Sequence, residues 1–547
     1  MPHPPGSRDD LSGGAPALDP LALFRRMASG VPAYRDFLEA RGIDPGLITS
    51  LTRVPLMSKD NYHLSYDLPS RCHGGTLTSG DVVAVSSGSS GRPTVWPRSI
   101  ADEQAVTARF EQVFADGFQA GSRSTLAVVC FALGNWVGGM YTTAACRHLA
   151  AKGYPLTVAT PGNDVPEILR VVAELGPYFD QVVLLGYPPF LKNVIDAGTD
   201  WAPYHLKLVL AGEVFSEQWR DLVGARAAIR DVTTDVASLY GTADAGVLGN
   251  ETPLSVRIRR FLAANPAVAQ TLFGESRLPT LVQYDPRTRF FESIPSLPDP
   301  SPSPAPPAPS GQPASSGQPA SSGQPAAAGT STVDSAATET ESPSSPDTPM
   351  VASAADGSAA GGAVSPDFSS PAGTPTLAFT ADGAVPLMRY HIADEGGLVS
   401  HADLVALCRA HGFEPGEGPE LPFVWVFGRS LFTVSFFGAN VYPENVTVGL
   451  ERPSVADRVT GKFVLSSVET EDRDRRLRVV VELAPGVAAS TALAETVATS
   501  IRAELLRLNS EFAHYVPEAY QLPEIELRPA GDPEHFPPGV KHRYTRR

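Results

Sequence analysis

The stretch Val85-Ser-Ser-Gly-Ser-Ser-Gly-Arg-Pro-Thr94 is rich in hydroxyl groups and glycine, and it directly follows the apolar run Val82-Val-Ala-Val85. Gly88 and Gly91 allow the backbone to adopt positive φ angles and to approach a ligand closely. The amide N–H groups of such a loop, together with its serine hydroxyl groups, are suited to bind the oxygens of an anion. We call residues 86–94 the serine loop and consider a phosphate-binding role for it.

Three interpretations of the serine loop remain open from its residues: a nucleotide-triphosphate loop, a dinucleotide fingerprint, or a turn that binds no ligand. Neither known phosphate motif fits the spacing. Arg92-Pro93 stand where G-x-x-x-x-G-K-[ST] requires Lys and Ser or Thr, and no G-x-G-x-x-G opens a helix. Pro93 excludes a helix that continues from the loop but suits a β-turn. Clusters of serine and glycine are also common in ordinary surface turns.

The composition indicates a protein of more than one domain, since 547 residues exceed the size of an ordinary single domain. The formal net charge of -16 argues against a general nucleic-acid binder, which normally carries a basic face. No apolar run approaches the ~18 residues of a membrane span. We therefore expect a soluble cytoplasmic protein with no nucleic-acid or membrane partner. The cysteines form no C-x-x-C pair and are expected to be reduced thiols: Cys72, Cys130, Cys146 and Cys408.

Short apolar runs alternate with helical stretches through the first half of the chain. The predicted strands are 125–131, 156–160, 181–185, 206–210 and 236–240, and the predicted helices are 101–121, 138–151, 165–174 and 216–229. This alternation is typical of stacked β-α units with mainly parallel strands. The predicted fold class is therefore α/β. One or two further helices are expected over 21–41, where apolar residues recur at helical spacing.

The composition changes abruptly between about Pro295 and Ala372, where proline, serine, alanine and glycine dominate. The hexapeptide Gly311-Gln-Pro-Ala-Ser-Ser316 is repeated at Gly317 and begins again at Gly323. Dense proline and low hydrophobicity cannot bury a core, so we expect a disordered insertion that acts as a spacer.

Order is expected to resume with an alternating strand over 376–380, followed by a turn at Asp382-Gly383. A smaller α/β unit follows from about Ser430. That unit contains a predicted strand over 476–483 and a predicted helix over 491–508. The sequence thus predicts three parts. They are a disordered start over 1–20, a large N-terminal domain over 21–428 that contains the insertion 295–372, and a small mobile C-terminal domain over 429–547.

Four further motifs follow the serine loop in order: Ser238-Leu-Tyr-Gly-Thr-Ala-Asp244, Arg389-Tyr-His-Ile-Ala-Asp394, Phe427-Gly-Arg-Ser430 and Gly539-Val-Lys541. In this order and at these separations they resemble the adenylate-forming superfamily, and most closely its phenylacetate-CoA ligase branch. The resemblance covers about Asp19 to Arg547 apart from the insertion. It is also carried by Trp136-Val-Gly-Gly139, Pro386-Leu-Met-Arg-Tyr390 and Gly438-Ala-Asn-Val-Tyr-Pro443, the last being particularly typical of that branch.

The resemblance implies an AMP-forming acid-thiol ligase with a large N-terminal domain, a hinge and a small C-terminal domain. Such an enzyme joins a carboxylic acid to the α-phosphate of ATP, releases pyrophosphate, and passes the acyl group to coenzyme A or to a carrier-protein phosphopantetheine. The implied ligands are ATP, Mg²⁺, a carboxylic acid and coenzyme A. Two alternatives stay open: an amide-forming ligase that uses an amine or another small nucleophile, and a catalytically weakened binding or scaffold relative. The oligomeric state is open, with a homodimer as one option.

The resemblance also implies roles for individual nucleotide-binding residues. The serine loop would hold the β- and γ-phosphates, Tyr240 would stack near the adenine, and Thr242 would reach the α-phosphate. Asp394 would accept the ribose hydroxyl groups, and Asp244 stands where relatives usually have a glutamate that binds Mg²⁺. The implied ATP- and AMP-binding residues are Ser86, Ser87, Gly88, Ser89, Ser90, Gly91, Thr94, Gly212, Glu213, Tyr240, Gly241, Thr242, Asp394 and Arg429. From the residues alone, 240–242 is also explained as a turn after a buried strand.

Lys541, Thr242 and Arg429 form the implied catalytic set. Lys541 would bridge the carboxylate and the α-phosphate, because an ammonium group stabilises negative charge on a transferring phosphoryl group; a basic, solvated tail is the alternative. Arg429 would contact the nucleotide near the hinge. There Leu431-Phe432 replace the acidic pair of relatives. This replacement puts the standard second half-reaction, the transfer of the acyl group to a thiol, in question. The implied acyl pocket consists of Phe131, Trp136, Gly138, Gly139 and Tyr187, and aromatic walls suit an aryl or arylalkyl acid.

Overall fold

The computed structural model describes residues 16–86, 94–274, 278–295, 375–429, 434–536 and 544–545. The expected disordered insertion thus falls outside the described residues except for Pro295. Of the expected disordered start over 1–20, residues 16–20 are described, and the Leu18 N–H donates to the Pro286 carbonyl at 2.8 Å.

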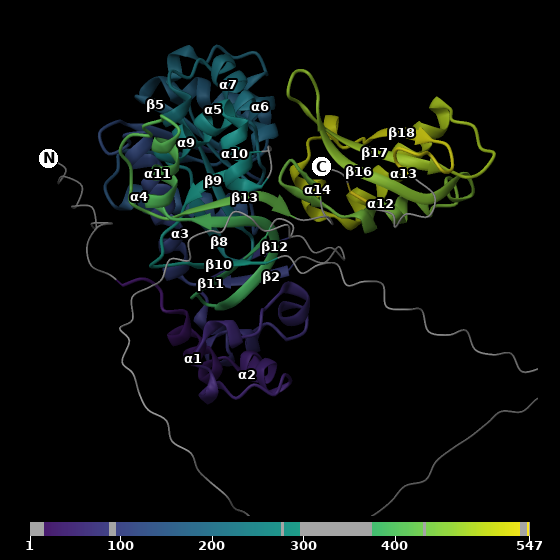
Figure 1. The fold of residues 1–547 in the computed structure, drawn as a ribbon. Helices are drawn as coiled ribbons and strands as arrows, with labels where there is room; N and C mark the ends of the chain where they lie inside the picture. The colour runs from purple at the N-terminus through teal and green to yellow at the C-terminus, as the bar shows by residue number, and fades with distance from the viewer. Residues whose placement is uncertain are drawn as a thin grey trace, which may run out of the picture. The chain divides into compact units, whose positions relative to one another are not determined.

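An 11-stranded sheet forms the centre of the fold (Figure 1). Its strands are β3 (Thr125–Val129), β4 (Leu156–Ala159), β5 (Gln181–Gly186), β6 (Lys207–Ala211), β7 (Val236–Thr242), β8 (Gly246–Asn250), β9 (Thr280–Gln283), β10 (Phe290–Ile294), β11 (Thr376–Ala381), β12 (Leu387–Val399) and β13 (Phe423–Arg429). Their order across the sheet is β10-β11-β12-β13-β9-β8-β7-β6-β5-β3-β4.

The half of the sheet from β4 to β7 is parallel and confirms the predicted α/β class. Every residue of β3 and β5 is buried, as expected for strands covered on both faces. The helices of this half are α4 (Val137–Ala151), α5 (Val165–Leu175), α6 (Pro188–Ile195), α7 (Glu217–Arg226) and α8 (Val232–Asp235).

The other half of the sheet, from β8 to β10, is antiparallel, and the alternation of strands and helices did not predict it. Within it, β10 pairs with β11, so that Ile294 lies opposite Thr376. The sequence insertion therefore lies in the connection between two neighbouring antiparallel strands. Three further helices belong to this part of the chain: α9 (Pro253–Ala264), α10 (Pro266–Phe273) and α11 (His401–Ala410).

The serine loop joins the strands of a separate two-stranded ribbon, β1 (Val82–Ser86) and β2 (Thr94–Arg98). The strands are antiparallel, and Ser86 lies opposite Thr94. Residues 87–93 lie outside the described residues, so the β-turn that Pro93 favours stays a prediction.

The helix expected over 101–121 is shorter than predicted. After β2 the chain forms α3 (Ile100–Gln112), which begins with Ser99 and Asp102 in a capping box, and then changes to a π-helical turn over Val113–Gly117. A Cβ on Gly117 would lie 2.8 Å from the Thr234 carbonyl oxygen, so another segment packs closely against the end of this turn.

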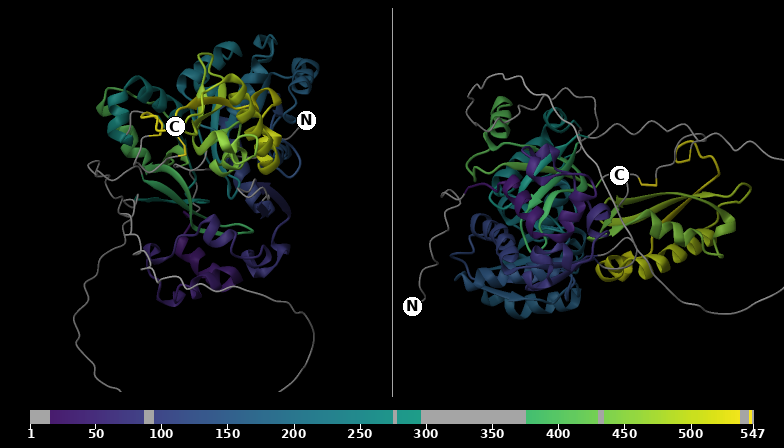
Figure 2. Two further views of the ribbon diagram at one scale, coloured as in Figure 1. Left: turned by 90° about the vertical axis from the view of Figure 1, so that its right-hand side faces the viewer. Right: turned by 90° about the horizontal axis from the view of Figure 1, so that it is seen from below.

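The two N-terminal helices expected over 21–41 are α1 (Pro20–Gly30) and α2 (Pro32–Glu39). Asp19 caps α1 through bonds from the Leu21 and Ala22 N–H groups. Apolar residues of both helices form one buried cluster with residues of β11 and β12. The two helices lie beside this part of the sheet in both views of Figure 2. The N-terminal helices therefore cover the antiparallel half of the sheet.

The C-terminal section is the α/β unit that the sequence predicts. Its sheet contains β16 (Val459–Glu469), β17 (Arg475–Leu483) and β18 (Glu524–Arg528), and α12 (Pro443–Leu450) and α13 (Thr491–Leu508) lie on one face of that sheet (Figure 1). A small hairpin of β14 (Val434–Phe436) and β15 (Ala439–Val441) precedes it, and α14 (Ser510–Tyr515) follows α13. The domain boundary near residue 429 and the mobility of this section stay predictions.

Within the described ranges, each helix is either too short or too polar to cross a bilayer.

Candidate functional site

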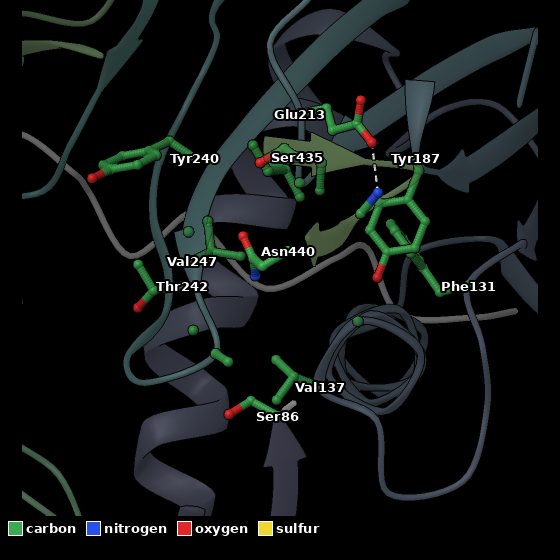
Figure 3. Close-up of a pocket in the computed structure, with 18 of the residues that line it drawn as sticks. Ser86, Phe131, Val137, Tyr187, Glu213, Tyr240, Thr242, Val247, Ser435 and Asn440 are labelled. Atoms are coloured by element: carbon green, nitrogen blue, oxygen red, sulfur yellow. Dashed lines mark hydrogen bonds between the residues drawn. The ribbon is translucent and has the colours of Figure 1, made fainter. Parts of the chain in front are cut away.

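A cavity of about 300 Å³ lies at the carboxyl ends of the parallel strands (Figure 3). Its lining includes Phe131 after β3, Tyr187 after β5, Gly212 after β6 and Thr242 at the end of β7. Ligands of open α/β sheets bind at this edge, because the strand ends and the loops that follow them leave a crevice there. The cavity is therefore the candidate active site.

Predicted site residues from distant parts of the sequence meet in this cavity. Those that line it are Ser86, Phe131, Gly138, Tyr187, Gly212, Glu213, Tyr240, Gly241, Thr242, Asp244 and Asp394. The predicted residues outside the described ranges are Ser87, Gly88, Ser89, Ser90, Gly91 and Lys541. Arg429 ends β13, where its backbone lies opposite Asp394.

Thr94, Trp136 and Gly139 were also predicted in the site but do not line the cavity. Thr94 is buried in the ribbon opposite Ser86. A Cβ on Gly139 would come within 2.2 Å of the Ala132 carbonyl oxygen, so this glycine permits close backbone packing. The ring of Trp136 instead packs against α14.

The base of the serine loop is fixed to the core of the protein. The indole Nε1–H of Trp96 donates to Ser86 Oγ at 3.0 Å, and the Val85 N–H donates to the Asn135 carbonyl at 2.8 Å. Both Trp96 and Ser86 are buried. The position at which the loop leaves β1 is therefore well defined.

Tyr240 and Asp394 connect the two halves of the central sheet inside the cavity. Tyr240 lies on β7, Asp394 lies on β12, and the Tyr240 hydroxyl donates to Asp394 Oδ2 at 2.7 Å. The pair places an aromatic ring beside a carboxylate that is only 6% exposed. This combination can contact a flat base and a hydroxyl donor of one ligand.

The turn that follows β7 presents Thr242 and Asp244 to the cavity. Thr242 Oγ1 accepts a hydrogen bond from the Ala245 N–H at 3.1 Å, and Asp244 Oδ2 accepts one from the Tyr390 hydroxyl at 2.7 Å. Magnesium prefers oxygen ligands and is often held by one or two carboxylates together with the phosphates of a substrate. The donor set of this turn therefore fits that ion.

Glu213 joins the large sheet to the C-terminal hairpin. The Gly438 N–H donates to Glu213 Oε1 at 2.6 Å, shown as the dashed line in Figure 3. Burial raises the pKa of Glu213, while the charge of Arg475 and the Gly438 hydrogen bond oppose that rise. Its other oxygen, Oε2, is buried and has no hydrogen-bond partner among the described residues.

The ring of Tyr187 fits between glycines of two different segments. A Cβ on Gly212 would lie 2.7 Å from Tyr187 Cε1, and a Cβ on Gly438 would lie 2.1 Å from the same atom. Both glycines also have positive φ angles, of 87° and 82°. Larger residues at either position would displace the ring from the cavity wall.

Several lining residues were not predicted from the sequence. These are Lys59, Val137, Tyr141, Thr142, Ser238, Ser435, Asn440, Tyr442, Glu511 and Tyr515, among others. The run from Gly438 to Pro443 supported the family resemblance, so Asn440 and Tyr442 could have been chosen from it. By contrast, no sequence motif marks Glu511, whose Oε2 accepts bonds from the Asn440 N–H at 3.1 Å and from Asn440 Nδ2 at 3.3 Å.

No known family model matches the sequence, and no curated protein is similar enough to match it. Among solved structures, 2-hydroxyisobutyryl-CoA ligase in complex with 2-HIB-AMP and CoA, in the thioesterification state, matches with a TM-score of 0.57 and 14% identity. The match covers 96% of this chain and 87% of that chain. This protein has the fold of that CoA ligase. The likeness confirms the fold expected for the adenylate-forming superfamily, and the phenylacetate-CoA ligase branch stays a prediction.

Two other matches have lower scores. An open conformation of the same ligase has a TM-score of 0.47 and 14% identity, with 96% of this chain and 89% of that chain covered. The amide bond synthetase McbA from Marinactinospora thermotolerans has a TM-score of 0.44 and 12% identity, with 93% and 79% covered.

Proposed function

We propose that this protein is an ATP-dependent acid-thiol ligase. It activates a carboxylic acid as an acyl-adenylate, releases pyrophosphate, and transfers the acyl group to coenzyme A or to a carrier-protein phosphopantetheine. One observation carries the proposal: Ser86 at the base of the serine loop lines a single cavity together with residues of β7, the turn after it and β12, at the carboxyl ends of the parallel strands.

The nucleotide would extend across the cavity from Tyr240 to the serine loop. The ring of Tyr240 offers a face for the adenine, and the Asp394 carboxylate accepts hydrogen bonds from ribose hydroxyl groups. Ser86, at the base of the serine loop, lies on the side where the phosphates would bind. Hydrogen bonds to ionised phosphate oxygens are stronger than bonds between neutral groups, which favours such a loop.

Asp244 and Thr242 are the residues that would hold Mg²⁺. When bound, the ion would neutralise charge on the phosphates. The protein's own contribution is to fix the position of the Asp244 carboxylate through the Tyr390 hydroxyl, and that of the Thr242 hydroxyl through the Ala245 N–H.

The acid would bind beside α4, where the wall is aromatic. The rings of Phe131 and Tyr187 pack edge to face with centroids 4.8 Å apart. Gly138 leaves space in front of both rings, because a Cβ there would lie 3.2 Å from Phe131 Cδ1 and 3.3 Å from the Tyr187 hydroxyl oxygen. An aryl or arylalkyl acid is the substrate class that this wall suits.

Glu511 favours a second candidate, an amide-forming ligase with an amine as acyl acceptor. Its carboxylate is 6% exposed and lines the cavity. A buried carboxylate attracts the cationic form of an amine, whereas it offers nothing specific to a thiol. Analysis of the products formed with coenzyme A and with a panel of amines distinguishes the two candidates.

The deciding experiment is carboxylate-dependent exchange of labelled pyrophosphate into ATP, across aryl, arylalkyl and short aliphatic acids. We expect exchange with one class of acid, and a loss of about 100-fold or more in Lys541→Ala, because groups that stabilise transition-state charge contribute on that order. The thermal midpoint of Lys541→Ala should match that of the parent. Undiminished exchange would remove Lys541 from the mechanism. No exchange with any acid, while ATP still binds, would favour a binding or scaffold relative.

A further inference from the structure

The buried guanidinium of Arg98, at the end of β2, holds the turn that follows β7. Its Nη2 donates to the carbonyl oxygens of Ala243, at 3.1 Å, and of Asp244. Its Nε donates to the Tyr141 hydroxyl on α4. Arg98 is 4% exposed and is not among the residues that line the cavity. Arg98 therefore contacts the turn without contacting the cavity.

A second arginine completes the support of the same turn. Arg289 is 6% exposed, and its Nη2 donates to the Ala245 carbonyl at 3.1 Å. Burial and the charge of Arg98 lower the pKa of Arg289 to about 10, so that it still carries a proton at neutral pH. Buried carbonyl groups require donors, and the two arginines supply them to three consecutive residues of the turn.

The ribbon that carries Arg98 also carries the serine loop. Trp96 and Arg98 lie two residues apart on β2 and so project from the same face. Trp96 donates to Ser86 Oγ, whereas Arg98 donates to the turn after β7. One short, buried piece of strand is thus bonded both to the base of the serine loop and to the Thr242–Asp244 turn.

We propose that Arg98 is a positioning residue that sets the spacing between Ser86, at the end of β1, and the Thr242–Asp244 turn, so that both contact the same polyphosphate group and its magnesium ion. The inference rests on the proposed function. Displacement of a binding group by about 1 Å can lower a rate by about 100-fold, so the spacing between the two elements matters more than the stability that the bonds add.

The geometry needs arginine rather than another cation. The planar fork of a guanidinium donates in several fixed directions, and here it reaches two carbonyl oxygens and a hydroxyl group from a buried position. A lysine ammonium is a point charge on a flexible stem and cannot span these acceptors together. Arg98→Lys is therefore a conservative variant that keeps the positive charge but cannot donate to all three acceptors of the guanidinium.

Arg257→Met provides a matched control. Arg257 lies on α9 and also donates to two carbonyl oxygens of one loop, those of Pro415 at 2.6 Å and Glu417 at 2.8 Å. Neither Arg257 nor that loop lines the cavity. The control thus loses the same kind of bond at a distance from the proposed site.

The experiment compares Arg98→Met, Arg98→Lys and Arg257→Met in pyrophosphate exchange and in calorimetric binding of ATP with and without Mg²⁺. We expect Arg98→Met to lower kcat/KM for ATP by about 100-fold and to weaken the Mg²⁺-dependent part of ATP binding. Arg98→Lys should fold like the parent and recover part of the loss, while Arg257→Met should stay within about twofold of the parent in both measurements.

Each outcome decides the inference. Equal kinetics and equal binding in Arg98→Met and Arg257→Met would overturn it and leave the proposed function intact. If the parent shows no exchange with any acid, the proposed function fails, and the calorimetric comparison alone decides the role of Arg98. A parent protein that binds no ATP in the presence of Mg²⁺ would overturn both. If Arg98→Met does not fold, Arg98→Lys is compared with Arg257→Met in the same two measurements.

Discussion

His63 is buried beside the rings of Trp96 and Tyr390, with ring centroids 4.4 and 5.2 Å away. Arginine can only donate, so His63 Nδ1 accepts the bond from Arg71 Nη1 at 2.8 Å, and the ring proton lies on Nε2. Burial, followed by the charges of Arg71 and Arg98, holds the pKa of His63 well below its ordinary value. The imidazole is therefore neutral in the folded protein.

This neutral histidine predicts a pH dependence of stability. An unfolded histidine binds a proton below pH about 6.5, whereas folded His63 does not, so the free energy of unfolding falls as the pH drops below that value. The slope from one such group is at most about 1.4 kcal/mol per pH unit. His63→Gln keeps an acceptor for Arg71 and does not titrate, so urea unfolding between about pH 7 and pH 5 should show a shallower slope.

The exposed His411 at the end of α11 offers the control for this measurement. His411→Gln should leave the slope of the parent unchanged. A slope in His63→Gln as steep as that of the parent would show that other groups cause the pH dependence.

Helix α7 is anchored to the central sheet by a buried network of ion pairs around Arg220. Arg220 is fully buried, and its Nη2 donates to both oxygens of Glu251 at 2.8 and 2.9 Å. Its Nε donates to Glu217 at 3.0 Å, and its Nη1 donates to the Val236 carbonyl at the start of β7 at 2.6 Å. The network thus fixes the strand that leads to the candidate site.

Removal of one partner from this network should be costly. Arg220→Met leaves the carboxylates of Glu217 and Glu251 buried with fewer partners, and we expect a loss of about 3–5 kcal/mol in the free energy of unfolding. Arg260 also pairs with Glu217, at 3.2 Å, but its side chain is 34% exposed. Arg260→Met should therefore cost about 1 kcal/mol or less. Chemical denaturation measures both values, and equal losses would contradict this account of the network.

The elements that could be predicted from the sequence are those whose pattern is local. Strands such as β3 and β5 are buried on both faces and appear as continuous apolar runs, so the parallel half of the sheet was expected. In the antiparallel half, the strand over 376–380 was expected and is β11, whereas the other strands were not expected. β12 contains register shifts in its pairing with both β11 and β13. β14 and β15 have only three residues each. None of these three strands therefore shows a clear hydrophobic period in the sequence.

The same limit applies to the candidate site. Tyr240, Thr242 and Asp394 belong to motifs and were predicted, and the structure brings them to one cavity. Glu511 and Tyr515 reach the cavity from α14, whose sequence resembles any short amphipathic helix, so their contribution depends on tertiary packing alone. Trp136 was predicted as a wall of the pocket but packs against α14, a contact that no local pattern encodes.

Charged residues connect the C-terminal section to the helices α6 and α7. Lys192 on α6 is 1% exposed, and its ammonium group lies 2.8 Å from Asp474 and 2.6 Å from Asp196. Arg226 on α7 pairs with Asp472. Asp196, Asp472 and Asp474 lie close enough together to suggest a metal site, but each of the three carboxylates already pairs with Lys192 or Arg226.

These ion pairs should control how firmly the C-terminal section is held. The double variant Asp472→Asn with Asp474→Asn leaves Lys192 buried with one carboxylate partner in place of three. We expect deuterium uptake in the β14–β15 hairpin and the β16–β17 turn to rise by about tenfold, which corresponds to about 1.4 kcal/mol. Uptake in β3 and β5 should not change. The exposed Asp457→Asn is the control, and equal uptake in both proteins would mean that the ion pairs do not hold the section.

Because Trp136 contacts α14, the fluorescence of this tryptophan can report on the position of that helix. Of the five tryptophans, Trp96, Trp201, Trp219 and Trp425 are buried, whereas Trp136 is half-buried and has the rings of His514 and Tyr515 5.3 Å away. Any movement of α14 would bring this indole into water and shift its fluorescence to longer wavelength, while the emission of the other four would stay constant. Intrinsic fluorescence can therefore follow the C-terminal section during ligand binding without a label.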